Sequence, residues 1–370
     1  MLAIAARPNS EHPVLVDIPA PRAAGPGEIL CRTLELGVCG TDREILLSRR
    51  PAVPAGGEQL ILGHECLGVV ESCGDGVTSF SPGDLVVPVV RRALPEFEQT
   101  YRVDMLAFGC FVERGIFHAD GFSAERWLDR PEHVLKVAPR LRDVAVLAEP
   151  LAVSEKAVNE ALVVQQARIG PRHWSDVPPR VLVTGQGPIA FTAVLASVAR
   201  GWPVTMTGRD QPSTFRAQLA QRFGARYVPM HDLLGMLDSD HAPLADVERD
   251  GFDLVLECTG GDDVMIGASA VLASRGVMVW LGSTRVPERT QRPVQRMMRD
   301  GILRNHLHVA VVNSAPRDFV DALAHLDQLL PTHGRELADL MTARVAPTDA
   351  LWHYEHRQGQ GIKTVVDYTS

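Results

Sequence analysis

The first 150 residues contain side chains that could bind a divalent metal ion. Cys39 follows an apolar, strand-like run, His64 and Glu65 precede another, and Glu149 stands just before a long helical pattern. Thiolate, imidazole and carboxylate are ligands that Zn²⁺ takes, and a catalytic zinc keeps one position open for water or substrate. Their wide separation along the chain establishes no site by itself. Taken singly, such a cysteine is more often a small buried hydrophobe, such a histidine a core residue, and such a glutamate a helix-start charge.

A second chemical feature is a glycine-rich turn in the middle of the chain. The sequence GQGPIA at 185–190 directly follows the apolar run 181–184 and opens a helical pattern. The first glycine permits a tight turn, the second lets the backbone approach a pyrophosphate, and the small Ala190 lets the helix pack closely on a sheet, with its N-terminus facing the anion. The pattern predicts a dinucleotide site that includes Gly185, Gly187, Pro188 and Ile189.

The end of the next predicted strand distinguishes the two dinucleotides. NAD-specific sites place Asp or Glu there, about 20 residues beyond the glycines, to bind the ribose 2′-hydroxyl. Gly208 stands at that position and Arg209 follows it. Space and a guanidinium suit a 2′-phosphate, which favours NADP(H) over NAD(H). Two alternatives stay open: Asp210 takes the role of the acid if the strand ends later, or Arg209 is a solvated loop cation.

The elements that must position these groups follow two patterns. Residues 1–150 alternate short β-type runs with Gly/Pro turns, which is typical of an antiparallel, partly closed barrel. Beyond residue 180, strands and helices alternate, which predicts a doubly wound parallel sheet of the α/β class, a Rossmann fold. The expected strands are 181–184, 204–207, 226–229, 253–257, 276–281 and 308–312, with helices at 189–200, 214–223 and 317–330.

The ends of the chain complete the predicted organisation. An apolar run at 362–368 is expected to return as a strand into the first domain. The first domain therefore comprises residues 1–152, completed by 313–370, and the dinucleotide-binding domain comprises 153–312.

Composition excludes several classes of protein. The 370 residues are 45% hydrophobic and 22% charged, as in ordinary globular chains, and the net charge of −8 disfavours nucleic-acid and membrane partners. The six cysteines include no CxxC pair and the N-terminus has no signal-peptide pattern, which predicts a cytoplasmic protein.

Three motifs resemble the zinc-dependent medium-chain dehydrogenase/reductase superfamily, namely GVCGTD at 37–42, GHECLG at 63–68 and GQGPI at 185–189. Within it, the chain is similar to the glucose dehydrogenase branch through VVPVVRR at 86–92, AEPLA at 148–152 and VVNS at 311–314. The resemblance implies a GroES-like catalytic domain beside the Rossmann domain, and a homodimer or homotetramer.

The resemblance also assigns roles around the metal. Cys39, His64 and Glu149 would be ligands of one catalytic zinc, and Glu65 a permanent or alternating ligand. Asp42 would orient His64, because a metal-bound imidazole needs a partner for its other nitrogen.

The implied activity is an oxidoreductase that transfers a hydride between NADP(H) and a secondary alcohol or carbonyl of a sugar, cyclitol or other polyol. Thr41 would relay the proton of the substrate hydroxyl. Asn313 would lie near nicotinamide or substrate, and Glu113 would contact sugar hydroxyls. Two other functions stay open on the same fold, a zinc-free quinone or enone reductase and a non-catalytic NADP(H)-binding protein.

The chain departs from the family in two respects. Residues 91–110 hold one cysteine where many members carry four, which predicts no structural zinc. Packing is expected to hold this lobe instead, through Leu94, Phe97, Tyr101, Met105, Leu106 and Phe108. Apolar side chains also stand where the branch contacts sugar, at Val153 and Leu303.

Overall fold

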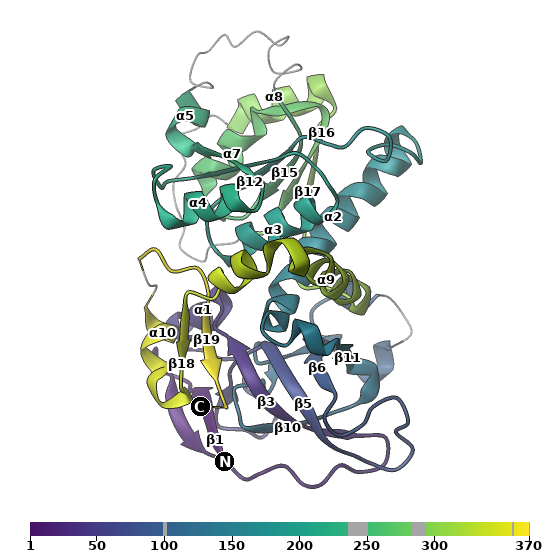
Figure 1. The fold of residues 1–370 in the computed structure, drawn as a ribbon, viewed down its shortest axis with the longest axis vertical. Coiled ribbons are helices and arrows are strands. Elements are labelled where there is room, and N and C mark those ends of the chain that lie inside the picture. Colours follow the sequence, from purple (N-terminus) through teal and green to yellow (C-terminus); the bar gives the residue numbers. More distant parts are fainter. Residues whose placement is uncertain (99–101, 236–250, 283–293, 357–358, 370) are drawn as a thin grey trace. The chain divides into compact units, whose positions relative to one another are not determined.

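The structure is a computed structural model that describes residues 1–98, 102–235, 251–282, 294–356 and 359–369. It divides into two compact units (Figure 1). Unit 1 comprises Met1–Ala152 and Asn313–Ser370, and unit 2 comprises Val153–Val312. Helix α2 (Ala148–Ile169) carries the chain from the first unit into the second.

Unit 2 is built on the predicted parallel sheet. Its six strands lie in the order β14-β13-β12-β15-β16-β17, so the first strand is central and the order reverses beside it, as in a Rossmann fold. The strands are β12 (Val181–Thr184), β13 (Val204–Gly208), β14 (Arg226–Pro229), β15 (Phe252–Glu257), β16 (Leu272–Trp280) and β17 (Leu307–Ala310). The helices are α3 (Pro188–Ala199), α4 (Phe215–Arg222), α5 (Met230–Gly235), α7 (Asp262–Ser269) and α8 (Val294–Arg304).

The central strand and the first helix of unit 2 form where the sequence predicts them. Every residue of β12 is buried, as expected for an apolar run covered on both faces of a parallel sheet. The predicted start of β16 at residue 276 is wrong, because the strand begins at Leu272. A bulge in the strand accommodates Arg275, whose φ of 65° lies in the left-handed region. The strand therefore runs through residue 276 and does not begin there.

Unit 1 is rich in β-structure and mostly antiparallel. A seven-stranded sheet runs β11-β6-β5-β3-β19-β18, with β10 also on β3, and two three-stranded sheets run β2-β1-β4 and β7-β8-β9. Its strands are β1 (Leu2–Ala6), β2 (Val14–Asp17), β3 (Ile29–Gly37), β4 (Leu60–Ile61), β5 (Glu65–Cys73), β6 (Leu85–Pro88), β7 (Arg91–Ala93), β8 (Phe111–Arg114), β9 (His118–Ala119), β10 (Arg126–Asp129), β11 (Val134–Val137), β18 (Ala343–Val345) and β19 (Thr364–Asp367). The pairs β18–β19 and β8–β9 are parallel, unlike the antiparallel pattern expected from the sequence.

Helices and short turns complete unit 1. They are α1 (Gly40–Ser48), α9 (Pro316–Asp339) and α10 (Leu351–Glu355), with 3₁₀ turns at Pro95–Phe97, Val103–Met105, Pro131–His133, Pro139–Leu141, Ala145–Leu147 and Pro347–Asp349. Helix α9 runs past Pro331, where the sequence predicts its end, and is kinked at His333, whose φ is −128°. A proline removes one hydrogen bond of the helix, which can bend the helix without ending it.

The returning strand β19 fixes the last part of the chain beside the first. It pairs antiparallel with β3, and Val365 stands opposite Gly37. The core around this pair includes Leu36, Phe122 and Tyr354, all fully buried. The strand expected at 362–368 therefore packs against the segment that leads into Cys39.

The packing expected of the 91–110 lobe is partly wrong. Leu106 is buried, but Met105 is 50% and Phe108 is 84% exposed, while Leu94 and Phe97 are half-buried. Tyr101 lies outside the described residues. The lobe also contains a buried ion pair, in which Arg91 bonds to Glu113, and the Arg91 guanidinium lies 3.9 Å from the centre of the Phe111 ring.

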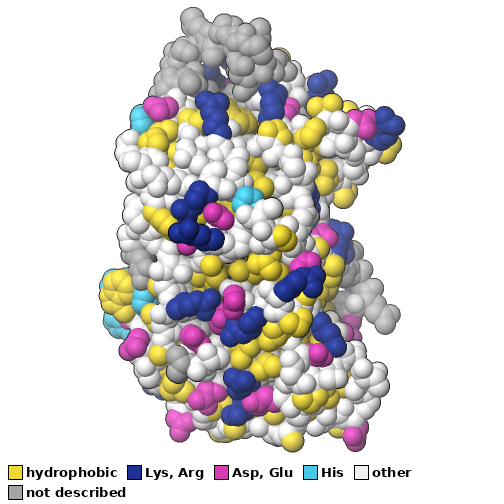
Figure 2. Space-filling view, in the orientation of Figure 1, with side chains coloured by type: hydrophobic (Ala, Val, Ile, Leu, Met, Phe, Trp, Pro, Cys, Tyr) yellow, Lys and Arg dark blue, Asp and Glu magenta, His cyan; other side chains and the backbone are white. Residues whose placement is uncertain are grey.

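Among the described residues, the helices are too short or too polar to cross a membrane. On the face drawn in Figure 2, acidic and basic side chains are interspersed.

Candidate functional site

Two neighbouring strand ends of unit 1 bring the expected metal ligands together. Strand β3 ends at Gly37, two residues before Cys39, and β5 begins at Glu65, directly opposite Gly37 in the sheet. A side chain at position 37 would come within 2.0 Å of the Glu65 carboxylate, so a glycine is required there. Gly63, with φ of 88°, makes the turn that brings His64 to the same end.

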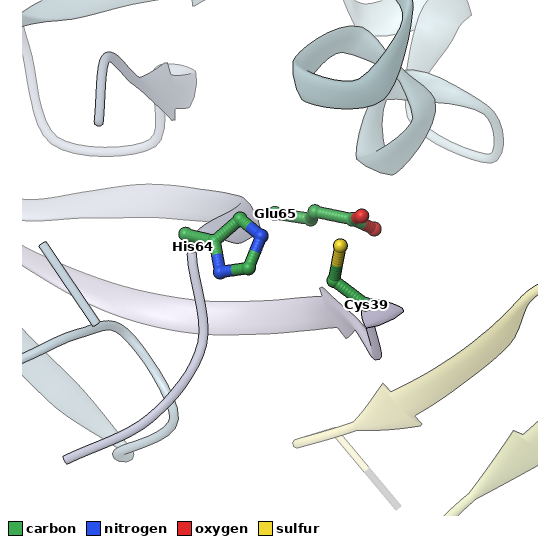
Figure 3. A group of neighbouring side chains, drawn as sticks. All are labelled: Cys39, His64 and Glu65. Atoms are coloured by element: carbon green, nitrogen blue, oxygen red, sulfur yellow. The ribbon is translucent and has the colours of Figure 1, made fainter. Parts of the chain in front are cut away.

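Cys39, His64 and Glu65 form a compact group of unlike ligands. One ligand atom of each lies within 4.8 Å of those of the other two. Figure 3 shows one ring nitrogen of His64 turned toward the sulfur of Cys39 and the carboxylate of Glu65. Ligands of a tetrahedral zinc stand roughly 3.5 Å apart, given bonds of about 2.0–2.3 Å. The sulfur, nitrogen and oxygen donors therefore fit a Zn²⁺ ion with little movement.

Asp42 lies beside both Cys39 and His64. Its carboxylate is fully buried and accepts the Cys39 backbone N–H at 2.9 Å, which caps helix α1. Its other oxygen lies 3.5 Å from Nδ1 of His64. Because Nδ1 faces Asp42, Nε2 is the histidine nitrogen left for an ion. Burial lowers the pKa of His64, but the charges of Asp42 and Cys39 together raise it by more. The resulting pKa is well above the ordinary value.

Thr41 lies beside the sulfur of Cys39. The thiol donates to the Thr41 hydroxyl at 3.7 Å, and the threonine side chain is half-buried. The hydroxyl expected to relay a proton is thus next to the candidate ligands.

Glu149 lies near this group, in the first turn of α2, but is not part of the cluster within 4.8 Å. Burial raises its pKa to about 7; the charge of His64 opposes this rise and that of Glu65 adds to it. A carboxyl that holds a proton near neutral pH in the metal-free chain must release it to bind an ion.

Lys363 is a member of the site that the sequence analysis missed. Its ammonium donates to both oxygens of Glu65, at 2.7 and 2.5 Å, and to the carbonyl of Val38 at 3.2 Å. Both side chains of the pair are at least 98% buried. Burial lowers the pKa of Lys363, but Glu65 and Cys39 raise it, and the net shift is upward, so the ammonium stays charged. A lysine inside the apolar run 362–368 is a signal that could have revealed it, because buried lysines need a partner.

The predicted substrate residues form a second cluster in unit 1. Asn313, in the left-handed region with φ of 60°, donates from Nδ2 to Oε1 of Glu113 at 2.7 Å. Arg91 donates to the same oxygen from two nitrogens, at 3.0 and 2.9 Å, and is itself 5% exposed. Glu113 and Asn313 were predicted from the sequence and Arg91 was not, although this arginine directly follows the apolar run 86–90. Three nitrogen atoms thus lie within hydrogen-bond distance of one oxygen of the carboxylate.

The glycine turn of unit 2 has the geometry that the motif predicts. Gly185 has φ of 96°, and its N–H donates to the Thr207 carbonyl at 2.8 Å. Gly187 caps helix α3, whose first residues are Pro188 and Ile189. The N-terminus of a helix that follows such a turn can bind an anion.

Strand β13 ends at Gly208, and the two residues that follow differ in their surroundings. Arg209 is exposed. Asp210 accepts two hydrogen bonds from Arg216, each of 2.8 Å. The alternative in which Asp210 acts as the ribose-binding acid is disfavoured, because Arg216 already occupies both of its oxygens.

The two apolar departures lie in unit 2. Val153 is half-buried in α2, and Leu303 is 68% exposed on α8.

Comparison with known proteins identifies the family. Residues 25–137 match the alcohol dehydrogenase GroES-like domain, and residues 142–368 match the glucose dehydrogenase C-terminus. The chain belongs to the glucose dehydrogenase family. A glucose 1-dehydrogenase of Thermoproteus tenax is 36% identical over 85% of this chain and 84% of its own length. A glucose 1-dehydrogenase of Halobacterium salinarum is 34% identical over 100% of this chain and 99% of its own length.

A solved glucose dehydrogenase shares the fold from end to end. The Haloferax mediterranei enzyme, in complex with NADP, Zn and gluconolactone, superimposes with a TM-score of 0.84 at 26% identity, covering all of both chains. Family membership confirms the expected Rossmann and GroES-like fold. This glucose dehydrogenase family member is an oxidoreductase acting on CH–OH groups.

Proposed function

We propose that this chain is a zinc- and NADP(H)-dependent dehydrogenase that exchanges a hydride with a secondary alcohol or carbonyl of a sugar, cyclitol or other polyol. The observation that carries the proposal is the convergence of Cys39, His64 and Glu65 within 4.8 Å. Sulfur, nitrogen and oxygen donors from three different residue types suit Zn²⁺ at this spacing.

The metal would be held by Cys39 and His64, with Glu65 or Glu149 supplying a carboxylate. Bound zinc supplies Lewis-acid chemistry toward a substrate oxygen. Asp42 faces the Nδ1 side of the imidazole, and Thr41 would pass the proton of the substrate hydroxyl on toward the cofactor or solvent.

Lys363 adds a positive charge to this centre. Ionised Cys39, Glu65 and Glu149 would place three negative charges around a +2 ion, with the buried Asp42 carboxylate beside them, and the ammonium of Lys363 offsets part of this excess of negative charge. A smaller excess of charge lowers the cost of burying these groups. It also weakens the hold of Glu65 on an ion, which supports a role for this carboxylate as an exchangeable ligand.

The dinucleotide would lie on the turn at 185–190, with its pyrophosphate at the N-terminus of α3. The glycine at 208 and the exposed Arg209 favour NADP(H) over NAD(H). The NADP in the Haloferax mediterranei complex supports the same preference.

The substrate would be bound by Glu113 and Asn313, whose carboxylate and amide suit hydroxyl groups. The names of the relatives point to glucose. Apolar Val153 and Leu303 cannot bind hydroxyls, so we propose a polyol whose contacts differ from those of glucose on that side.

We also propose a homodimer or homotetramer. Val294, Met298 and Ile302 lie four residues apart on α8, and 44%, 60% and 76% of their surfaces are exposed. An apolar stripe of this kind supports a protein contact, which size-exclusion chromatography with light scattering will measure.

The test is a dehydrogenase screen with and without a chelator, on wild-type protein and Cys39→Ser. We expect turnover of a polyol with NADP⁺ that chelation abolishes, and a loss of at least about 100-fold in kcat for the variant. Zinc measured by mass spectrometry should fall from one ion per chain to none, with NADP⁺ affinity unchanged.

The two other functions predict different results. A zinc-free quinone or enone reductase keeps its turnover in chelator and in Cys39→Ser. A non-catalytic protein binds NADP(H) tightly but turns over no alcohol.

A further inference from the structure

The side chain of Gln186 lies across the end of strand β13. The Gly185 N–H bonds to Thr207, which brings the turn beside this strand end. A side chain at Gly208 would come within 2.1 Å of Oε1 of Gln186. The glutamine amide therefore fills the place that an acidic side chain at 208 would take, and Gly208 is required by this packing.

The amide of Gln186 is only half satisfied. Its Oε1 accepts the Asp210 N–H at 3.2 Å, which fixes the amide so that Nε2 faces the other way. Nε2 is buried and has no acceptor among the described residues, and the whole side chain is 7% exposed. A buried donor without an acceptor is costly, and such groups are rare in native proteins unless a ligand or water completes them.

The groups around this donor offer no free carboxylate. Arg216 binds both oxygens of Asp210, and Thr214 donates to one of them at 3.4 Å. Burial would raise the pKa of Asp210, but the bonds and charge of Arg216 lower it below its ordinary value. What remains at the strand end is the amide NH₂ and the exposed guanidinium of Arg209, both donors.

Donors without acceptors suit one of the two dinucleotides. A 2′-phosphate presents only acceptor oxygens and up to two negative charges, whereas a ribose 2′-hydroxyl has a proton to donate. A neutral amide that donates is compatible with the phosphate, and an acid in its place would repel it.

We propose that Gln186 is a specificity-determining residue that donates from Nε2 to the 2′-phosphate of NADP(H). This inference rests on the proposed binding of NADP(H) at the 185–190 turn and names a residue that selects it. Because Nε2 is covered in the ligand-free chain, binding must turn the Gln186 amide toward the phosphate.

The test measures dissociation constants of NADP⁺ and NAD⁺ by calorimetry on the full chain. Gln186→Met keeps the shape and removes the donor, and should weaken NADP⁺ binding about tenfold or more while changing NAD⁺ binding less than threefold. Gln186→Glu adds a negative charge and should weaken NADP⁺ binding further. Gln218→Glu is the matched control, because this glutamine is exposed on α4, and it should leave both constants unchanged.

A double-mutant cycle tests the packing part of the inference. Gly208→Ala should displace Gln186 and weaken NADP⁺ binding as Gln186→Met does. In a Gln186→Ala background the clash is gone, so Gly208→Ala should then have little further effect on affinity or melting temperature.

The failures are distinguishable. If wild type prefers NADP⁺ and Gln186→Met keeps that preference, the role of Gln186 is overturned and the proposed cofactor stands. An equal loss of both dinucleotides in Gln186→Met also overturns the selective role. If wild type prefers NAD⁺ or binds neither, the proposed cofactor preference fails and the inference fails with it.

Discussion

The buried pair of Glu65 and Lys363 is the residue-scale feature with the clearest energetic consequence. Taking two charges out of water costs several kcal/mol per ion, and the short contacts of 2.5 and 2.7 Å offset that cost only while both partners are present. The pair thus adds little to the free energy of unfolding, but removal of either partner alone leaves the other as a buried, uncompensated charge.

Removal of Lys363 alone should therefore be severe. We expect Lys363→Met to lower the free energy of unfolding of the metal-free chain by about 3–5 kcal/mol, since it leaves the Glu65 carboxylate buried and unpaired. Urea unfolding in the presence of chelator measures this.

Neutralising both partners is the control. The double variant Glu65→Gln with Lys363→Met should recover most of the lost stability, because no uncompensated charge remains. Equal destabilisation of the single and double variants would show that Lys363 acts through packing and not through its charge.

At the scale of elements, the edge of the unit 2 sheet contains an unusual pair of histidines. His306 precedes β17 and His308 lies in it. Burial, together with the charges of Arg304 and His308, lowers the pKa of His306 to about 4. The ring is therefore neutral in the folded chain at neutral pH.

This predicts a loss of stability in acid. The pKa of His306 is lower in the folded chain than in the unfolded chain, where it is about 6.5, so the unfolded chain binds the proton first as the pH falls. The contribution of neutral His306 to the free energy of unfolding is therefore fully present above pH 6.5. It is lost as the pH drops toward 4. His306→Gln should lessen the loss between pH 7 and 4.5 by about 1 kcal/mol, a value reduced for partial exposure. Urea unfolding at several pH values measures it, and parallel pH curves for both proteins would contradict it.

The elements also show which parts of the structure a sequence can predict. Strand β12, its glycine turn and helix α3 follow from local patterns, and the structure has them within one residue of the predicted bounds. The bulge at Arg275 and the exposure of Phe108 depend on tertiary packing that no local pattern contains. Lys363 and Gln186 were missed for the same reason, since their roles arise from contacts across sheet neighbours. The metal ligands were found through family motifs and not through spacing.

At the scale of the whole molecule, the metal ligands and their supports all belong to unit 1, and the dinucleotide turn belongs to unit 2. A bound ligand stabilises the part of the protein that binds it. We therefore expect the metal to stabilise unit 1 and the dinucleotide to stabilise unit 2.

Metal removal should therefore act locally. After chelation, we expect amide hydrogen exchange to rise about tenfold or more in peptides that cover 37–45, 60–68 and 360–367, because the buried charges lose a common partner. Peptides from 181–208 are the internal control and should not change. Equal changes in both sets, or no change in the first, would contradict a metal centre confined to unit 1.

The ion pair between Glu65 and Lys363 spans 298 positions of the chain. At a translation rate of about 5–20 residues per second, the carboxylate leaves the ribosome roughly 15–60 s before the ammonium that neutralises it. Throughout that interval the nascent chain carries a thiol, an imidazole and an unbalanced acid together. A stalled or truncated product would thus keep the Glu65 carboxylate without its partner, and only synthesis through Lys363 supplies the ammonium that neutralises it.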